Sequence, residues 1–276
     1  MIRRFSLTNG RGDTWSLDRP GYCFLYEPEG LGYAESANYE RLGTAWVSED
    51  PKPQQATIRG EIIFPGRSPY EAYRAFGRFL RYDQLTLLYE TPAGSFYRKV
   101  RAAEITKTEI VEGFILRCDL RLVCMGLWYT PARVEPIGEV TILTDAAGNY
   151  LTDAAGNILT TNLGDYTVVN RGDVAMPFTL EIQGPVSNPV FSMTRAGKTT
   201  TITFPVEVAS GQRLVYSSVD GDLYCRVMQG STLVQNVVPL FGATVDVFKK
   251  IPVGTYEVSV DGSGVTIGAR EEYKRV

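Results

Sequence analysis

Histidine is absent from this chain of 276 residues, and with it the side chain that proteins use most often as a general base and as a metal ligand. The four cysteines, Cys23, Cys118, Cys124 and Cys225, form no Cys-x-x-Cys pair of the kind that binds zinc. The glycine-rich loops that hold nucleotide phosphates are also missing. We therefore expect four buried free thiols and no catalytic residue, no metal site and no cofactor.

Long hydrophobic segments and a strong excess of one charge are missing as well. No uninterrupted apolar run approaches the ~20 residues that a membrane helix needs, and no apolar stretch of signal-peptide length follows the basic first residues. The formal net charge is −3 and the isoelectric point about 5.3, which gives no global attraction to nucleic acid or an anionic membrane. We expect a soluble protein made in a cytoplasm, without membrane contact.

The first half of the chain shows the alternation of apolar and polar residues that is typical of half-buried strands. Residues 55–64 alternate in this way, and residues 114–124 form the clearest strand, with Arg117, Asp119 and Arg121 on its polar face. Its predicted core face comprises Phe114, Leu116, Cys118, Leu120, Leu122 and Cys124. With its neighbours and one helix, this strand predicts a compact β-barrel that closes near Trp128-Tyr129.

One segment has the features of a helix. Ser68 is an N-cap residue, Pro69 suits the first helical position, and Glu71 follows the cap by three residues, as in a capping box. The apolar residues of the next three turns gather on one side and are Ala72, Phe76, Phe79 and Leu80. We expect an amphipathic helix that ends near Phe79-Leu80.

A basic stripe follows the opposite side of this helix. Arg74, Arg78 and Arg81 recur at four- and three-residue spacing and therefore share one face. Such a face is usually solvated, which is the interpretation we favour. The alternative is a docking surface for a neighbouring protein or for DNA.

The composition shifts between about residues 131 and 164. The sequence LTDAAGN at residues 143–149 recurs at residues 151–157, an eight-residue offset. Each copy has an Asp-x-x-Gly-Asn turn between strand-compatible residues, so we predict a linker of short hairpins. Calcium binding is disfavoured because each copy has one aspartate, too few oxygen ligands for this ion.

The second half of the chain predicts an antiparallel, jelly-roll-like sandwich, since short alternating strands recur at roughly 8 to 12 residues with turns between them.

Arg-Gly-Asp occurs at residues 11–13 and 171–173, and Asp-Gly-Asp at residues 220–222; we interpret all three as turns rather than as adhesion or metal motifs. The predicted organisation is a barrel domain at residues 1–135, the linker at 136–164 and a sandwich domain at 165–276.

The order and spacing of several short motifs resemble those of the distal tail proteins of long-tailed siphophages. In the first half, these motifs include Gly30-Leu31-Gly32 after Glu29, Arg59-Gly60 at the head of a strand, and Trp128-Tyr129 after Leu127. In the second half they include Gly184-Pro185 and Asn188-Pro189. The resemblance covers most of the chain, although the Asp-Ala-Ala-Gly-Asn repeat has no place in the shared pattern.

The resemblance implies a mainly β fold, with an N-terminal split β-barrel that carries one α-helix and a C-terminal galectin-like sandwich. It also implies a hexameric ring around a DNA channel in the virion. The expected partners are further copies of the chain, the tail tube protein, and the baseplate hub and receptor-binding proteins, with DNA as passing cargo. The alternatives that we weighed are a carbohydrate-binding attachment module and a cell-wall hydrolase with two carboxylates.

Overall fold

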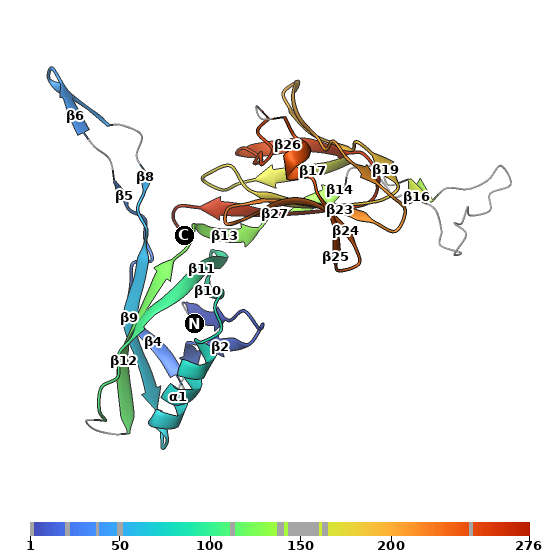
Figure 1. Ribbon diagram of the computed structural model, residues 1–276. Helices are drawn as coiled ribbons and strands as arrows, with labels where there is room; N and C mark the ends of the chain where they lie inside the picture. The colour runs from blue at the N-terminus through green and yellow to red at the C-terminus, as the bar shows by residue number, and fades with distance from the viewer. Residues whose placement is uncertain are drawn as a thin grey trace. The chain divides into compact units, whose positions relative to one another are not determined.

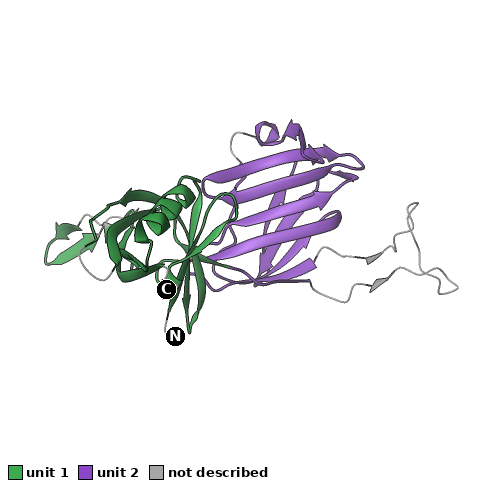
Figure 2. Ribbon diagram, turned by 90° about the horizontal axis from the view of Figure 1, so that it is seen from below, with its two compact units in different colours: residues 1–130, 273–276 green, residues 131–272 purple. Residues whose placement is uncertain are grey.

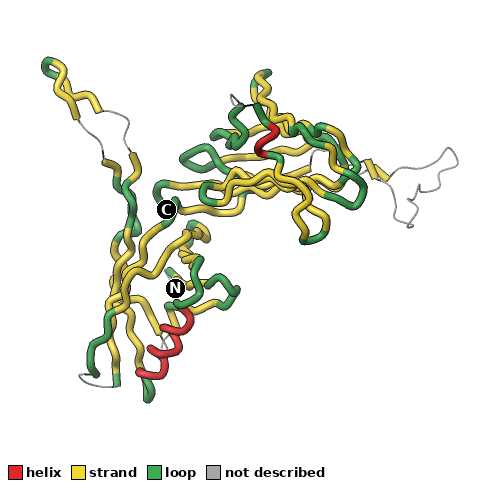
Figure 3. Tube along the Cα trace, in the orientation of Figure 1, coloured by secondary structure: helices red, strands yellow, loops and turns green. Residues whose placement is uncertain are grey.

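The computed structural model describes residues 3–19, 23–36, 39–48, 52–110, 114–136, 141–142, 160–161, 165–242 and 245–276. The chain divides into two compact units, unit 1 with residues 1–130 and 273–276, and unit 2 with residues 131–272 (Figure 2). The described part consists mostly of antiparallel strands with one α-helix (Figure 3). The predicted mainly β fold class is confirmed.

Unit 1 is built on a strongly bent antiparallel sheet with the order β3-β4-β9-β12-β11-β10-β1-β2 (Figure 1). The long strand β11 allows the bend, because its first half pairs with β10 and its second half with β12. The strands are β1 (Arg4–Thr8), β2 (Thr14–Ser16), β3 (Asp18–Arg19), β4 (Cys23–Glu29), β9 (Thr57–Pro65), β10 (Leu85–Thr91), β11 (Gly94–Ile105), β12 (Ile115–Cys124) and β13 (Trp128–Pro131).

The described strands of unit 1 do not close into a continuous ladder. Between β1 and β4 the connection runs through Leu17, whose N–H donates to the carbonyl of Phe5 at 2.9 Å. The Leu17 carbonyl accepts the N–H of Leu25 at 2.7 Å. The described strands therefore form no closed barrel, and the predicted closure near Trp128-Tyr129 was wrong, because β13, which contains both residues, pairs in unit 1 with β11 alone. A barrel joined by single hydrogen bonds is split, as the resemblance implied.

Strand β12 follows the predicted alternation except at its first residue. The apolar face from Leu116 to Cys124 is buried, and Arg117, Asp119 and Arg121 are exposed. The expectation for Phe114 was wrong: its φ is 57° and its side chain is 65% exposed. Phe114 belongs to the turn before β12, where the left-handed backbone removes it from the strand alternation.

Helix α1 spans Pro69–Phe79, as the sequence predicts, and covers the core side of the sheet (Figure 1). Its anchor is Phe76, whose ring lies 5.8 Å from that of Phe64 on β9. The predicted side-chain capping box does not form, because Ser68 makes no side-chain cap bond. The Ser68 carbonyl instead accepts the N–H groups of Glu71 and Ala72 at 3.1 and 3.2 Å.

Between β4 and β9 the chain leaves the sheet as a narrow extension that the sequence motifs did not indicate. It consists of two short ladders, β5 (Glu35–Ser36) with β8 (Lys52–Pro53) and β6 (Tyr39–Leu42) with β7 (Ala45–Ser48). Trp46 near its tip is 67% exposed. The extension therefore adds surface to unit 1 rather than core.

Unit 2 is a sandwich of two antiparallel sheets, β25-β24-β23-β18-β27 and β14-β17-β26-β20-β21. Its core includes stacked aromatic rings, with Phe178 and Phe191 at 4.5 Å. The strands are β14 (Val134–Pro136), β17 (Asp165–Asn170), β18 (Phe178–Gln183), β20 (Val190–Arg195), β21 (Lys198–Thr203), β23 (Arg213–Val219), β24 (Asp222–Gln229), β25 (Thr232–Asn236), β26 (Gly254–Val260) and β27 (Ser263–Tyr273).

Three smaller elements complete unit 2. They are the ladder of β19 (Val186–Ser187) with β22 (Glu207–Val208), the ladder of β15 (Thr141–Ile142) with β16 (Thr160–Thr161), and the short 3-10 helix η1 (Val238–Leu240). The repeat at residues 143–157 and the predicted turns within it lie outside the described residues. No helix of the described residues has the length and apolar character to cross a membrane.

Candidate functional site: two charged faces of unit 1

The outer side of α1 forms the first charged surface of unit 1, which we call the helix face. Because Phe76 points into the core, residues on the opposite side of α1 point away from the sheet. The three arginines of the predicted stripe, Arg74, Arg78 and Arg81, are all exposed there. Arg67 and Glu71 complete the face, and Arg67, Glu71, Arg74 and Arg78 line a shallow hollow.

The helix face is strongly basic. It carries four arginines against one glutamate, and in the described part of the chain none of these five side chains takes part in an ion pair. Like charges three and four residues apart on a helix repel one another by a few tenths of a kcal/mol. Arg74 and Arg78 repel one another in this way on α1, Arg81 follows just after the helix ends, and Glu71 is the single acidic side chain of the face.

The opposite side of the sheet forms the second charged surface, which we call the sheet face. Alternation along β9 and β12 turns Ile58, Ile62 and Leu120 into the core and the residues between them outward. The charged residues that line a shallow hollow on this side are Glu27, Glu29, Arg59, Glu61, Glu104, Arg117, Asp119 and Arg121. Within this hollow, five carboxylates against three arginines give a net negative charge, and the exposed Arg101 on β11 lies on the same side of the sheet.

The register of the strands places like charges directly opposite one another on the sheet face. Glu61 lies across from Asp119, an arrangement that destabilises a strand pair. Arg117 forms an ion pair with Glu61, with 3.1 Å between its nitrogen and the carboxylate oxygen. Asp119 accepts a hydrogen bond from the Thr106 hydroxyl at 3.2 Å, and no ion pair to it is found among the described residues. The sheet face thus retains uncompensated negative charge at Asp119.

Sequence reasoning predicted the strands of the sheet face but not the face itself. The alternating charges of residues 117–121 and 59–61 were visible, but the sequence does not give the register that sets them side by side. Arg59, one of the residues matched to distal tail proteins, lies opposite both Glu29 and Arg121. It is therefore part of the sheet face.

Several other motif residues of unit 1 hold its backbone in place. Gly30 has a φ of 79°, and a β-carbon there would collide with the carbonyl oxygen of Thr57, so this turn requires glycine. The carbonyl of Leu31 accepts a hydrogen bond at 3.3 Å from the indole N–H of Trp128, which is fully buried. Gly32, by contrast, is exposed and would have open space around a β-carbon.

Gly60 and Tyr129 have packing roles in the same unit. A β-carbon on Gly60 would lie 2.8 Å from Cδ1 of Leu25 and 3.0 Å from the carbonyl oxygen of Tyr26, where β4 bulges. The ring of Tyr129 stacks on that of Tyr97 across β13 and β11, with 5.7 Å between the centroids. Both residues shape the sheet, and Gly60 also lines the hollow of the sheet face.

The motif residues of unit 2 lie around one loop. The peptide bond between Gly184 and Pro185 is cis, and a β-carbon on Gly184 would come within 2.7 Å of the Val208 carbonyl oxygen. Asn188 adopts a φ of 46°, and its N–H donates to the carbonyl of Val206. The carbonyl of Pro189 accepts the N–H of Phe204 at 2.9 Å. These residues fix the backbone geometry of this loop.

The cysteines are buried free thiols, as predicted. Burial raises the pKa of Cys23 and of Cys225 to about 12 and that of Cys118 to about 11, since an apolar environment disfavours the thiolate. No group of three or more acidic or cysteine side chains in the described residues is placed to hold a metal ion. These thiols are therefore poor nucleophiles at neutral pH.

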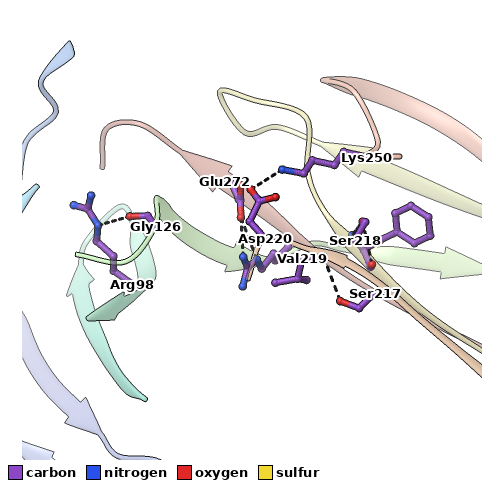
Figure 4. Close-up of polar contacts among 10 residues, drawn as sticks. Arg98, Gly126, Ser217, Ser218, Val219, Asp220, Lys250 and Glu272 are labelled. Atoms are coloured by element: carbon purple, nitrogen blue, oxygen red, sulfur yellow. Dashed lines mark hydrogen bonds and ion pairs between the residues drawn. The ribbon is translucent and has the colours of Figure 1, made fainter. Parts of the chain in front are cut away.

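Each unit buries ionisable groups that serve its own fold (Figure 4). In unit 1, Arg98 is 5% exposed, and its Nε donates to the Gly126 carbonyl at 2.8 Å while its guanidinium lies over the ring of Trp128. In unit 2, Glu272 is 7% exposed and accepts hydrogen bonds from Arg270. Burial lowers the pKa of Arg98 and raises that of Glu272.

The three short motifs that we interpreted as turns lie in turns or bends. Residues 11–13 connect β1 to β2, and residues 220–222 contain the tight turn between β23 and β24, where Asp220 pairs with Lys250 at 2.7 Å (Figure 4). Gly172 in the second Arg-Gly-Asp is buried against the backbone of Glu272. That burial makes the second motif part of the packing of unit 2.

Comparison with known proteins finds one family model and several solved structures that are similar to this chain. Residues 4–125 match the family model described as the N-terminal domain of distal tail proteins. A chain of the phage P2 baseplate in its activated conformation with Ca shares the fold with a TM-score of 0.69, at 15% identity over 100% of both chains. The corresponding chain of the phage P2 baseplate with Sr has the same TM-score and identity over the same coverage.

A second solved protein shares this fold. The Dit protein of phage SPP1, described as a paradigm of the hub adsorption apparatus in phages that infect Gram-positive hosts, has a TM-score of 0.61 and 13% identity. The match covers 97% of this chain and 98% of that one. No curated protein matches the chain. The resemblance found in the sequence motifs is confirmed.

Proposed function

We propose that this chain, whose residues 4–125 match the model of the N-terminal domain of distal tail proteins, is a distal tail protein and a structural component of a phage tail tip. It assembles by itself into a hexameric ring that joins the tail tube to the baseplate and surrounds the channel for DNA. It carries out no catalytic step. Its place is the virion, after synthesis in the cytoplasm of the host.

The observation that carries this proposal is the match of residues 4–125 to the distal tail protein model, together with a fold likeness that runs the whole length of the chain. The solved relatives include a baseplate chain and a hub protein. A likeness at 15% identity shows a shared fold, and the family match adds the functional class for the first unit.

Unit 1 has the surfaces that a ring component needs. A ring of identical subunits uses heterologous contacts, in which one surface of each subunit binds a different surface of the next. The helix face and the sheet face lie on opposite sides of unit 1 and differ in charge. The outermost strands of its described sheet, β2 and β3, offer edges for further contacts with neighbours.

Further copies of the chain are the first partners of the proposed ring, followed by the tail tube protein and the hub and receptor-binding proteins of the baseplate. DNA is cargo rather than a ligand. The carbohydrate-binding alternative has no specific support, since the most exposed large apolar residues described in unit 2 are aliphatic and comprise Leu223, Leu233, Val234, Leu240, Val245 and Val253.

The mass of the purified chain tests the proposal. Light scattering on a sizing column is expected to give six copies per particle, and negative-stain images of the same peak are expected to show a ring with a central hole. A chain that remains a monomer at the highest soluble concentration would contradict a ring formed by this protein alone.

A further inference from the structure

We infer that the helix face of one copy docks on the sheet face of the next, so that these two charged surfaces form the repeating contact of the ring. The inference rests on the proposed function, because it names the surfaces by which the ring closes. The occupant of each face is thus a second copy of this chain.

The docking is supported first by the positions of the helix face and the sheet face within unit 1. Helix α1 covers the core side of the sheet through Phe76 and Phe79, and the charged residues of β9 and β12 point to the other side. The helix face and the sheet face therefore point in opposite directions within unit 1. Surfaces on opposite sides of one body are suited to head-to-tail contacts, which close a ring when the rotation between copies allows it.

The docking is supported next by the opposite charges of the helix face and the sheet face. The helix face has four arginines against one glutamate, and the hollow of the sheet face has five carboxylates against three arginines. Opposite charges across an interface steer association and fix its orientation. Two copies that met through identical faces would instead juxtapose like charges.

The docking is also supported by the repulsion between like charges within each face. Arg74 and Arg78 repel one another along α1, with Arg81 just beyond its end, and Glu61 lies directly across from Asp119 on the sheet. An arginine from a neighbouring copy near Asp119 would relieve both repulsions. A guanidinium also offers a planar fork of donors that fits a carboxylate well.

Charge reversal tests the pairing. The helix variant carries Arg74→Glu, Arg78→Glu and Arg81→Glu, and the sheet variant carries Glu61→Lys, Glu104→Lys and Asp119→Lys. All six side chains are at least partly exposed, and circular dichroism of each variant checks that it folds. We expect each variant alone to form no rings, because its two faces then have charges of the same sign.

An equimolar mixture of the two variants gives the decisive result. Each helix face then meets a sheet face of opposite charge in an alternating ring, so the mixture is expected to recover the particle mass of the original chain. The matched control for the helix variant carries Arg171→Glu, Lys198→Glu and Arg226→Glu, the same charge change at exposed positions of unit 2, and is expected to form rings as the original chain does.

The outcomes separate this inference from the proposed function. If the original chain forms rings and both variants still do so, the pairing is overturned while the ring stands. If folded variants fail to assemble and the mixture fails as well, the pairing is overturned too. An original chain that stays monomeric would overturn the ring and the pairing together.

Duplex DNA is the other anionic partner that the helix face could bind. Fluorescence anisotropy with a labelled duplex of about two helical turns measures it directly, at low salt where phosphate contacts are strongest. We expect the original chain and the helix variant to bind this duplex equally weakly. Tight binding that the arginine substitutions abolish, with the rings retained, would assign the helix face to nucleic acid and overturn the inference.

Discussion

The two units of this chain complete their cores in different ways. Unit 2 faces two sheets toward each other, so that both supply the inner side chains that fill the core. Unit 1 covers its bent sheet with a single helix and leaves the other side of the sheet polar. A core that lies between one sheet and one helix leaves the outer side of the helix and the outer side of the sheet exposed, and these two surfaces can differ in charge. Unit 1 thereby has two distinct faces available for assembly.

The largest expected effect comes from removing the aromatic anchor of the helix. Phe76 is fully buried and lies within 6.0 Å of the rings of Trp15, Phe64 and Phe79, so Phe76→Ala should cost about 3–5 kcal/mol. Hydrogen exchange should show this loss of stability as faster exchange in the strands of unit 1. The matched variant Phe178→Ala should speed up exchange in the strands of unit 2. If either variant speeded up exchange equally in both units, the two cores would not be separate.

A smaller effect is expected where a strand of unit 1 needs glycine. Gly60→Ala places a methyl group 2.8 Å from Cδ1 of Leu25 and 3.0 Å from the Tyr26 carbonyl oxygen, so it should destabilise unit 1 by about 1–3 kcal/mol. Gly32→Ala is the control, because a β-carbon there meets no atom within 4 Å. Urea denaturation of the two variants measures the difference. Equal stability would show that β4 moves aside.

The buried carboxylate of unit 2 should give a pH-dependent effect. Burial raises the pKa of Glu272, although the nearby Arg270 opposes this shift. A raised pKa in the folded state stabilises the protein below the unfolded value of about 4.3, and this contribution is lost as the pH rises through the folded value. Glu272→Gln should therefore flatten the decline of unit 2 stability between acid and neutral pH.

The control for that experiment is Glu257→Gln, which changes an exposed carboxylate of the same unit. Urea denaturation over a pH series, followed by hydrogen exchange in β18 and β23, measures both variants. A pH profile that Glu272→Gln leaves unchanged would show that another group governs the acid dependence of unit 2.

The smallest expected effect concerns the buried arginine of unit 1. Arg98 lies over Trp128, and one of its terminal nitrogens, Nη1, is buried without a hydrogen-bond partner among the described residues. Replacing a poorly compensated buried charge by an apolar group of similar length is often neutral or stabilising. Arg98→Met should therefore change stability by no more than about 1 kcal/mol, or raise it. Arg98→Ala, which also removes the packing on Trp128, should be less stable than Arg98→Met in the same denaturation experiment.

Some of these features could be predicted from local sequence because their causes are local. The alternation of residues 116–124 marks β12 and its buried thiols, and Pro69 with the apolar stripe at Phe76 and Phe79 marks α1. The absence of histidine is a matter of composition, and it removes the commonest general base from consideration. The arginine stripe was likewise visible from its helical spacing.

Other features depend on which segments meet, and local sequence does not record that. The alternation at Phe114 continued the strand pattern, but the backbone turns there and exposes the side chain. The extension around Trp46 lacked a motif. The sheet face required the pairing of Glu61 with Asp119, two residues far apart in sequence that only the register between β9 and β12 brings together.

The sequence by itself therefore determined the class of fold, the position of the helix and the lack of a histidine-based site, since periodicity and composition act through neighbouring residues. Only the tertiary structure decided that the arginines of α1 and the acidic side of the sheet lie on opposite sides of one unit. The physical reason is that charge patterns on separate elements acquire a common direction only when a core fixes those elements against each other.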